Sequence, residues 1–237
     1  MLVLAIDTST PAGTACVFEH GGICAEISLS SDVNHSERLL PSIISALKLA
    51  RKELQEIDLI GYVKGPGSFT GLRIGLGTVK GLAFANRIPI IGVSSLEAVA
   101  LNIPDTDSVI CPMLDARKQE VYCALYRRQN GSLEIIEPEA TRDPAAFARK
   151  AGRKAVFVGG GAARYKDEIM KATGGRAAFA PDHLGRPHGP VIAAMAAEAF
   201  LENGGENLAS AAPVYIRKSE AELRLMERLS SLPRRAK

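Results

Sequence analysis

The alternation of apolar and polar positions in the first hundred residues predicts a β-rich opening followed by two long helices. Three short apolar stretches, separated by glycine-containing turns, predict strands at 2–7, 14–19 and 23–29. Apolar residues recur at helical spacing from Ser36 to about Arg51, and a second helix is predicted from about Phe69 to Asn86. Strands at 57–63 and 88–93 flank this second helix, and a short helix capped by Ser94 or Ser95 closes this half.

The same order of elements begins again after Pro104. Strands are predicted at 108–115, 119–127, 132–137, 154–158 and 176–180, and helices at 143–151, 164–173 and 187–203. The order β-β-β-α-β-α-β-α thus occurs twice, although no repeat is visible residue by residue. Two such lobes describe the α/β actin/hexokinase/Hsp70-like (ASKHA) fold of duplicated βββαβα lobes, in which a nucleotide usually lies between the lobes. We therefore expect an N-terminal lobe over 1–104 that carries the partner-binding helices, a C-terminal lobe over 105–217 and a C-terminal helix or tail over 218–237.

Composition fits a globular protein, with 46% apolar and 23% charged residues. No apolar run reaches the roughly 18 residues of a membrane span, and the N-terminal run ends at Asp7 without a basic flank, so no signal peptide is predicted. We expect a cytoplasmic protein with four reduced cysteines, although Cys16 and Cys24 could face each other across a hairpin. The formal charge of +3 does not by itself indicate nucleic-acid binding. A solvated helix face or a tRNA contact would each explain the basic residues near the end: Arg217, Lys218, Arg224, Arg228, Arg234, Arg235 and Lys237.

Two predicted hairpin turns occupy the positions where this fold holds phosphate. In the first lobe, the carboxylate of Asp7 and the hydroxyls of Thr8 and Ser9 could hold Mg²⁺ and approach phosphate oxygens. The second-lobe turn 115–119 has no glycine, and it places two long basic side chains where a phosphate loop needs open backbone. The run Gly159, Gly160 and Gly161 could admit an adenosine, although such a run is also a common strand-to-helix connector.

Residues suited to metal binding or nucleophilic catalysis are few. His35 opens a helix, but the residue four positions later on the same face is Leu39 rather than a second histidine. The remaining histidines, His20, His183 and His188, lie in predicted turns and loops with no fixed common face. No serine has a nucleophile-elbow signature, and no cysteine stands beside a histidine. We therefore predict neither a metal site nor a catalytic residue.

The predicted helix 69–86 contains four glycines, each of which costs about 1 kcal/mol relative to alanine. Gly71 and Gly75 share one face, and Gly77 and Gly81 continue a stripe of small residues on a neighbouring face. Because small residues allow another element to approach at backbone distance, two such faces predict close packing on two sides. One side is expected to be the protein's own sheet and the other a partner helix, with helix 36–51 as its neighbour in that surface.

Several distinctive motifs lie in order along nearly the whole chain. The most specific is the run from Gly65 to Gly75, GPGSFTGLRIG. The others are Ile6–Ser9, His35–Pro41, Gly92–Ala98, Leu114–Arg117 with Glu120–Tyr122, and Pro213–Arg217. Together these motifs resemble those of the TsaB (YeaZ) family. The resemblance implies an actin-like fold and a role in forming N6-threonylcarbamoyladenosine (t6A) at position 37 of tRNAs that read ANN codons. It also implies that the chain binds and activates the paralogous catalytic subunit TsaD, while the ATPase TsaE supports turnover.

The resemblance further implies where partners bind. Helices 35–51 and 69–86 are expected to form a bundle with their counterparts in TsaD or in a second copy of this chain. The residues expected in this interface are Leu39, Leu40, Ile43, Leu47, Gly71, Ile74, Gly75 and Thr78. No cofactor of its own is implied, although ATP or ADP could occupy a composite site formed with the partners, and tRNA would be reached through the complex. The metal site of the paralogue uses His-x-x-x-His, and Leu39 departs from that catalytic pattern.

Two other functions are compatible with such a fold. An ATP-dependent small-molecule kinase or ATPase would need Asp7, Asp115 and the glycines 159–161 to close around Mg-ATP, and the basic turn at Arg117 argues against it. A metal-dependent peptidase, by analogy with the paralogue, would need a second histidine in place of Leu39.

Overall fold

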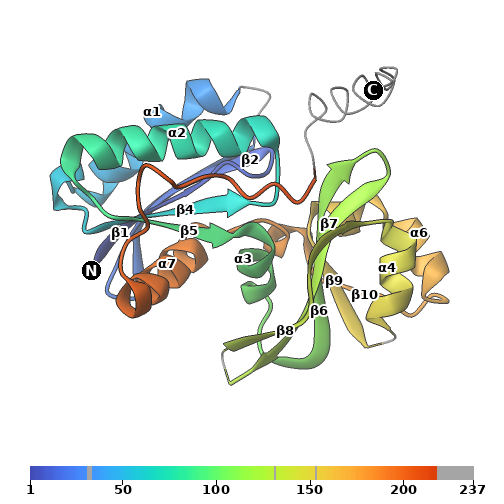
Figure 1. Ribbon diagram of the computed structural model, residues 1–237. Helices are drawn as coiled ribbons and strands as arrows, with labels where there is room; N and C mark the ends of the chain where they lie inside the picture. The colour runs from blue at the N-terminus through green and yellow to red at the C-terminus, as the bar shows by residue number, and fades with distance from the viewer. Residues whose placement is uncertain (31–33, 131, 153, 218–237) are drawn as a thin grey trace, which may run out of the picture.

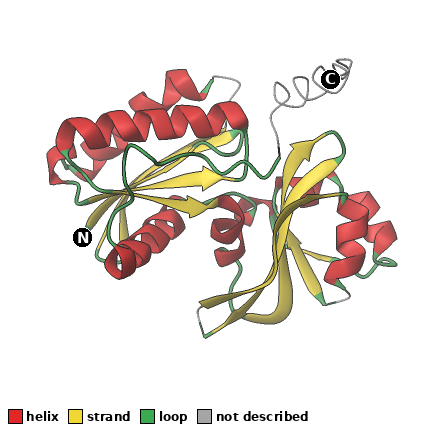
Figure 2. Ribbon diagram, viewed as in Figure 1, coloured by secondary structure: helices red, strands yellow, loops and turns green. Residues whose placement is uncertain are grey.

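The computed structural model describes residues 1–30, 34–130, 132–152 and 154–217, which form two lobes side by side (Figure 1). Each lobe is built on a five-stranded sheet with helices on both faces (Figure 2). The two sheets have equivalent strand orders, β3-β2-β1-β4-β5 and β8-β7-β6-β9-β10, so the duplication predicted from the element order is present. This topology confirms the actin/hexokinase/Hsp70-like fold class.

The first sheet combines an antiparallel meander with two parallel strands. Its strands are β1 (Leu2–Asp7), β2 (Ala12–Glu19), β3 (Gly22–Ser30), β4 (Leu59–Gly65) and β5 (Ile90–Ser94). β1 lies at the centre, antiparallel to β2 and parallel to β4, and all six of its residues are buried. The β1–β2 connection therefore emerges from the middle of the sheet, at the edge that faces the second lobe (Figure 1).

Two long helices cover one face of this sheet. They are α1 (His35–Ala50) and α2 (Phe69–Asn86), and the short 3-10 helix η1 (Leu54–Glu56) follows α1. The hydroxyl of Ser68 accepts a hydrogen bond from the Gly71 N–H and caps α2, and both helices end at a residue in the left-handed region. One apolar stripe of each helix packs on the sheet in a shared core that includes Leu39, Ile43, Leu47, Leu76, Val79 and Ala83.

The second lobe repeats this plan with shorter helices. Its strands are β6 (Thr106–Arg117), β7 (Glu120–Gln129), β8 (Ser132–Arg142), β9 (Ala155–Val158) and β10 (Ala178–Phe179). One face carries α4 (Pro144–Ala151), α5 (Gly160–Arg164) and α6 (Lys166–Ala172), with a core centred on Phe147, Phe157 and Ile169. The 3-10 helix η2 (Asp182–Leu184) leads from β10 back toward the first lobe.

The element order indicated a division between the lobes at residue 105. The remaining two helices do not follow this division, because each packs mainly on the other lobe. Helix α7 (Gly189–Asn203) packs on the first sheet, where Ile192, Ala193 and Ala196 join a core with strands β1, β2, β4 and β5. Helix α3 (Ser95–Leu101) packs mainly on strands of the second lobe, through Leu96 and Val99. Each sheet therefore buries its second face against a helix from the other half of the sequence, because both faces of a largely buried sheet must be covered.

A terminal segment crosses the molecule after α7. Leu208 and Ala211 pack against the first core, the Val214 N–H donates to the Lys64 carbonyl at 2.7 Å, and Arg217 donates to the Ala116 carbonyl at 3.0 Å. The predicted tail 218–237 and its basic residues lie outside the described residues. Within the described part of the chain, no helix is long and apolar enough to cross a membrane, and all four cysteines are free.

Candidate functional site

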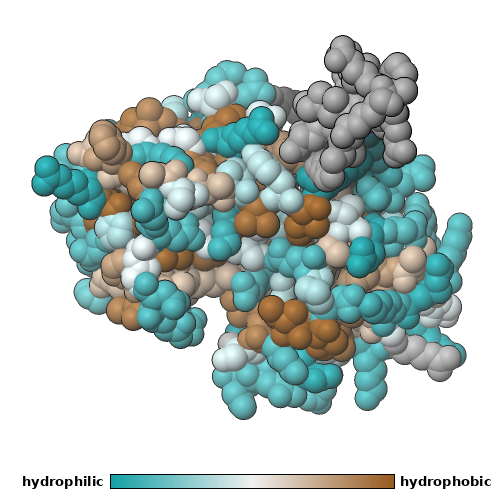
Figure 3. Space-filling model, in the orientation of Figure 1, coloured by the Kyte–Doolittle hydropathy of each residue, from teal (hydrophilic) through white to brown (hydrophobic). Residues whose placement is uncertain are grey.

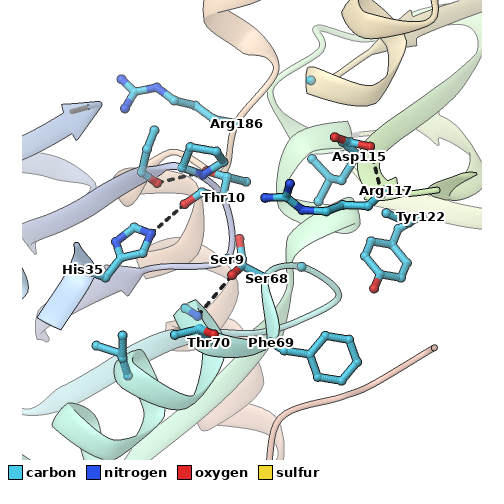
Figure 4. Close-up of a pocket in the computed structure, with 18 of the residues that line it drawn as sticks. Ser9, Thr10, His35, Ser68, Phe69, Thr70, Asp115, Arg117, Tyr122 and Arg186 are labelled. Atoms are coloured by element: carbon cyan, nitrogen blue, oxygen red, sulfur yellow. Dashed lines mark hydrogen bonds between the residues drawn. The ribbon is translucent and has the colours of Figure 1, made fainter. Parts of the chain in front are cut away.

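A cleft between the two lobes contains several of the residues predicted for ligand binding (Figure 4). Its volume is about 1390 Å³, and its walls are the β1–β2 loop and the starts of α1 and α2 on one side, and β6, the β6–β7 turn and α5 on the other. Among the residues predicted for a nucleotide, Ser9 and Gly160 line the cleft, whereas Asp7, Thr8, Gly159 and Gly161 lie behind its surface.

Asp7 lies at the end of β1 and is 1% exposed. Its Oδ1 accepts a hydrogen bond of 2.7 Å from the Ser9 N–H, and its Oδ2 has no hydrogen-bond partner among the described residues. Burial raises the pKa of Asp7 to about 6, and the hydrogen bonds from Ser9 and the charge of Arg186 only partly oppose this effect. The carboxylate is thus sealed below the cleft wall rather than presented to a ligand.

Thr8 and Ser9 have different roles although they are neighbours in the same loop. The Thr8 hydroxyl donates to the Gly71 carbonyl at 2.8 Å, so it is engaged within the first lobe. The backbone of Ser9 is also held, since its carbonyl accepts from the Ser68 N–H at 2.8 Å. The Ser9 hydroxyl is 3% exposed as a residue and has no partner among the described residues, although it lies in the cleft wall. The Ser9 hydroxyl is buried beside Asp7, so neither of the first-lobe hydroxyls at 8 and 9 is exposed in the cleft.

His35 also lines the cleft, where it supports the loop that follows Ser9. Its Nε2–H donates to the Thr10 carbonyl at 2.9 Å (Figure 4), and burial together with the nearby Arg38 lowers its pKa. Leu39, four residues later, points into the core of the first lobe. No group of three or more His, Cys, Asp or Glu side chains with the arrangement of a metal site occurs among the described residues.

The equivalent turn of the second lobe is filled by side chains. Arg117, Lys118 and Gln119 all have positive φ, at 61°, 52° and 60°, a conformation that residues with a Cβ rarely adopt. Asp115 is fully engaged, because its Oδ1 accepts from the Arg117 N–H at 2.9 Å and its Oδ2 from Arg164 at 2.8 Å. The side chain of Arg117 extends from this turn into the space between the lobes (Figure 4).

The three consecutive glycines also serve mainly the packing of the second lobe. A Cβ at Gly159 would lie 2.3 Å from the Met113 carbonyl oxygen, and one at Gly161 would lie 2.9 Å from Leu114, so both allow α5 to approach β6 closely. A Cβ at Gly160 would meet nothing within 4 Å, which leaves one glycine of the three open. The structure thus brings Ser9 and Gly160 to one cleft, while the other predicted nucleotide residues support its walls.

The residues predicted for a partner interface are divided between the protein's own core and its surface. Leu39, Ile43 and Leu47 are buried against the first sheet, and Gly71 and Gly75 pack against Thr8. Ile74 and Thr78 are half-buried, and Leu40 is exposed. The helices predicted for the interface therefore do present a surface, but most of the residues predicted on it face inward.

Other residues of the same helices take the exposed positions. Ile44 and Leu49 on α1 and Phe84 on α2 are exposed hydrophobic residues, and Gly77 and Gly81 are open to solvent. For α1, the sequence does indicate that some apolar residues must be exposed, because its apolar positions form an arc wider than one sheet-facing stripe. Periodicity does not say which of these positions face the sheet.

A second feature missed from the sequence fastens the terminal segment after α7 to the start of α2. The ring of Tyr215 stacks on that of Phe69 with centroids 4.6 Å apart, and its hydroxyl accepts from Arg73 Nε at 2.9 Å. Both aromatic residues belong to recognised motifs, at Gly65–Gly75 and Pro213–Arg217, but no spacing rule places residues 146 positions apart side by side.

Comparisons with known proteins agree over most of the chain. The family model described as TsaD: tRNA N6-adenosine threonylcarbamoyltransferase matches residues 13–225. The tRNA threonylcarbamoyladenosine biosynthesis protein TsaB of Bacillus subtilis (strain 168) is 34% identical over 232 residues, 96% of this chain and 99% of that protein. TsaB of Escherichia coli (strain K12) is 32% identical over 227 residues, 93% of this chain and 96% of that protein. The structure of YeaZ from Pseudomonas aeruginosa superposes with a TM-score of 0.75 at 29% identity, covering 90% of this chain and 99% of YeaZ.

Proposed function

The chain belongs to the TsaB (YeaZ) family, and from that membership we propose that it is a non-catalytic subunit that binds and activates TsaD. The relatives are named as t6A biosynthesis proteins, which supports a role in forming this nucleoside in tRNA. The match to the TsaD family model supports a paralogous pair, in which two similar folds could associate through equivalent surfaces.

The observation that carries the proposal is an exposed apolar face on α1 and α2. We call it the α1–α2 face and define it by Leu40, Ile44, Gly77, Gly81 and Phe84. Leu40 and Ile44 are 47% and 58% exposed one turn apart on α1, and Phe84 is 79% exposed on α2. In Figure 3, hydrophobic atoms are exposed over these two helices among polar ones. Large exposed apolar side chains grouped on one surface are typical of protein–protein interfaces.

The glycines make this face suitable for another helix in particular. No atom lies within 4 Å of the position that a Cβ would take at Gly77 or Gly81, so a partner helix could approach the α2 backbone there. Phe84 lies seven residues after Gly77, two turns along the same side of α2, and could insert beside that partner helix. Two helices from each protein would then form a four-helix bundle with a small-residue seam.

The state of the cleft supports an accessory role rather than independent catalysis. Asp7 is sealed, Asp115 is bound by Arg164, and His35 is held by Thr10, so none of the three is placed to activate a nucleophile. In the proposed complex TsaD performs the transfer to position 37 of tRNA, TsaE supports turnover, and ATP or ADP would bind at a site shared with these partners. A homodimer through the same α1–α2 face is expected in the absence of TsaD, in the cytoplasm.

Disruption of the α1–α2 face tests the proposal directly. We expect the Ile44→Glu/Phe84→Glu variant to fold and to lose its complex with the cognate TsaD in size-exclusion chromatography with light scattering. Product t6A on a tRNA transcript should fall in parallel when TsaD, TsaE and the donor threonylcarbamoyl-adenylate are supplied. The matched control is Leu201→Glu/Ile135→Glu, because Leu201 and Ile135 are 76% and 61% exposed and lie outside this face.

The control variant is expected to bind and activate TsaD like the natural chain. Retention of the complex by Ile44→Glu/Phe84→Glu would contradict this use of the α1–α2 face. Formation of t6A by TsaD and TsaE alone, at the rate seen with this chain present, would contradict the proposed function itself.

A further inference from the structure

The cleft between the lobes concentrates positive charge. Seven Arg or Lys side chains line it against a single carboxylate, Asp115, so the lining carries a formal charge of 7 − 1 = +6. The whole chain carries +3, and the remainder therefore sums to 3 − 6 = −3. The basic side chains come from six separate segments: Arg38, Arg73, Arg117 with Lys118, Arg164, Arg186 and Arg217. Such clustering on one surface of an otherwise acidic molecule is typical of a site for a polyanion.

Two of these side chains make no hydrogen bond or ion pair within the described residues, although the charge of Arg186 acts on the buried carboxyl group of Asp7. Arg164 is paired with Asp115 and Arg217 with Glu120, whereas the guanidinium groups of Arg117 and Arg186 form no hydrogen bond or ion pair within the described residues. Arg117 also stands in the left-handed region without being glycine or asparagine. The conformation of the turn therefore holds the guanidinium group of Arg117 in the cleft, where it has no hydrogen-bond or ion-pair partner within the described residues.

Within the described residues, the opposite wall contributes no carboxylate to the cleft. The Ser9 hydroxyl is buried in this wall without a hydrogen-bond partner, and Asp7 lies behind it. Phe69 and Tyr122, one from each lobe, line the cleft on the same side in Figure 4, with Arg117 beside Tyr122. Basic side chains and aromatic rings along one groove are the groups that bind the backbone and the bases of RNA.

We propose that the interlobe cleft is an RNA-binding groove in which Arg117 and Arg186 contact phosphates of the tRNA that the complex modifies. The inference rests on the proposed role in t6A formation, which supplies the RNA. It assigns this chain a direct contact with the substrate, in addition to the contact with TsaD through the α1–α2 face.

The geometry favours a nucleic-acid strand over a mononucleotide. The cleft volume of about 1390 Å³ exceeds the range of roughly 300–1,000 Å³ that is usual for small-ligand pockets. The charges are spread over six segments rather than gathered around one phosphate loop, and the glycines that would admit an adenosine are mainly used in packing α5. Asp7, the carboxylate that would hold Mg²⁺ for a nucleotide, does not line the cleft.

Neutralisation of the two unpaired cations tests the proposal in the full chain. The Arg117→Asn/Arg186→Gln variant removes both charges, and asparagine tolerates the left-handed conformation at 117. Binding of a fluorescent, unmodified transcript of an ANN-reading tRNA would be followed by anisotropy between about 50 and 200 mM salt. We expect about a tenfold loss of affinity at the lower salt and a decrease of about 2 in the slope of log K against log[salt]. The matched control, Lys171→Gln/Arg176→Gln, removes two exposed charges of the second lobe outside the cleft and should bind like the natural chain.

The outcomes separate this inference from the proposed function. Unchanged RNA affinity of Arg117→Asn/Arg186→Gln would overturn the inference. This holds also if the basic residues after Arg217 then prove to bind the RNA. Displacement of the transcript by micromolar ADP would also overturn it and would identify a mononucleotide site. The cleft variant should still form its complex with TsaD, and Ile44→Glu/Phe84→Glu should still bind RNA. A cleft variant that binds RNA like the natural chain contradicts only this inference, and a face variant that still binds TsaD contradicts only the proposed use of the α1–α2 face.

Discussion

Helix α2 contains two pairs of glycines with opposite surroundings. A Cβ at Gly71 would lie 2.0 Å from the Thr8 carbonyl oxygen, and one at Gly75 would lie 2.2 Å from the Thr8 Oγ1. A Cβ at Gly77 or Gly81 would meet no atom within 4 Å. All four carry the same intrinsic cost to the helix, about 1 kcal/mol each. The first pair is explained by this chain's own fold, whereas no contact within the described residues explains the second pair, which the proposed partner helix would.

The largest effect is expected from filling the buried pair. Gly71→Leu would force a side chain into the Thr8 backbone, which cannot move without displacing the end of β1. We expect a loss of more than about 3 kcal/mol in the free energy of unfolding, since overpacking against backbone is costlier than against flexible side chains. Urea denaturation followed by circular dichroism would measure it, and a stability within about 1 kcal/mol of the natural chain would contradict the close packing.

A double variant sharpens this test, because the two buried glycines meet different atoms of Thr8. In Gly75→Ala the new Cβ meets the Thr8 hydroxyl, so adding Thr8→Ala should restore much of the lost stability. In Gly71→Ala it meets the Thr8 carbonyl, and Thr8→Ala should give no rescue. Thr8→Ala alone removes the 2.8 Å hydrogen bond to Gly71 and should cost about 1 kcal/mol.

The next effect concerns Asp7, the residue before Thr8. Its buried carboxyl group makes the stability of the fold around Gly71 and Gly75 depend on pH. Burial raises its pKa from 3.8 to about 6, so the folded state binds a proton more tightly than the unfolded state. Stability should therefore fall as pH rises from about 4 to about 6 and stay lower above that range, by about 3 kcal/mol from this group.

Asp7→Asn isolates this contribution, because other buried acids titrate equally in both proteins. The stability difference between the natural chain and the variant should change by about 3 kcal/mol between pH 4 and pH 7, in favour of the variant at pH 7. Any effect of the new amide on stability that does not depend on pH cancels when the two pH values are compared. Parallel pH profiles of the two proteins would show that Asp7 is not desolvated as the structure indicates.

The fold could be predicted from the sequence because its signals are local. Strand β1 and helix α2 begin and end at the predicted residues, Leu2–Asp7 and Phe69–Asn86, since an apolar run ending at a polar turn and a serine cap each define a boundary. The position of α7 could not be predicted in this way. Its apolar residues indicate burial, but only the three-dimensional arrangement shows that it crosses to the first sheet.

The sites were less predictable, because they depend on which of two similar faces is covered. Two glycine faces were expected on α2, and the structure assigns Gly71 and Gly75 to the inner one. On α1, Leu39 and Leu40 are equivalent in the sequence, and only the sheet below the helix decides that Leu39 is buried. The charge of the cleft arises from residues between 38 and 217 that only folding brings together.

The smallest effect, and one of opposite sign, is expected at the exposed pair. Gly77→Ala and Gly81→Ala add a methyl group in open space and replace the poorest helix former except proline with the best, so each should stabilise the isolated chain by about 1 kcal/mol. For a chain of this size, that corresponds to a rise of about 2–4 °C in Tm, measurable by calorimetry. The same variants should weaken the complex with TsaD, because each methyl group holds the partner helix away from the α2 backbone. A variant that is more stable alone and weaker in the complex would show that the exposed glycines serve the partner and not the fold. Destabilisation of the isolated chain would remove the distinction between the two pairs.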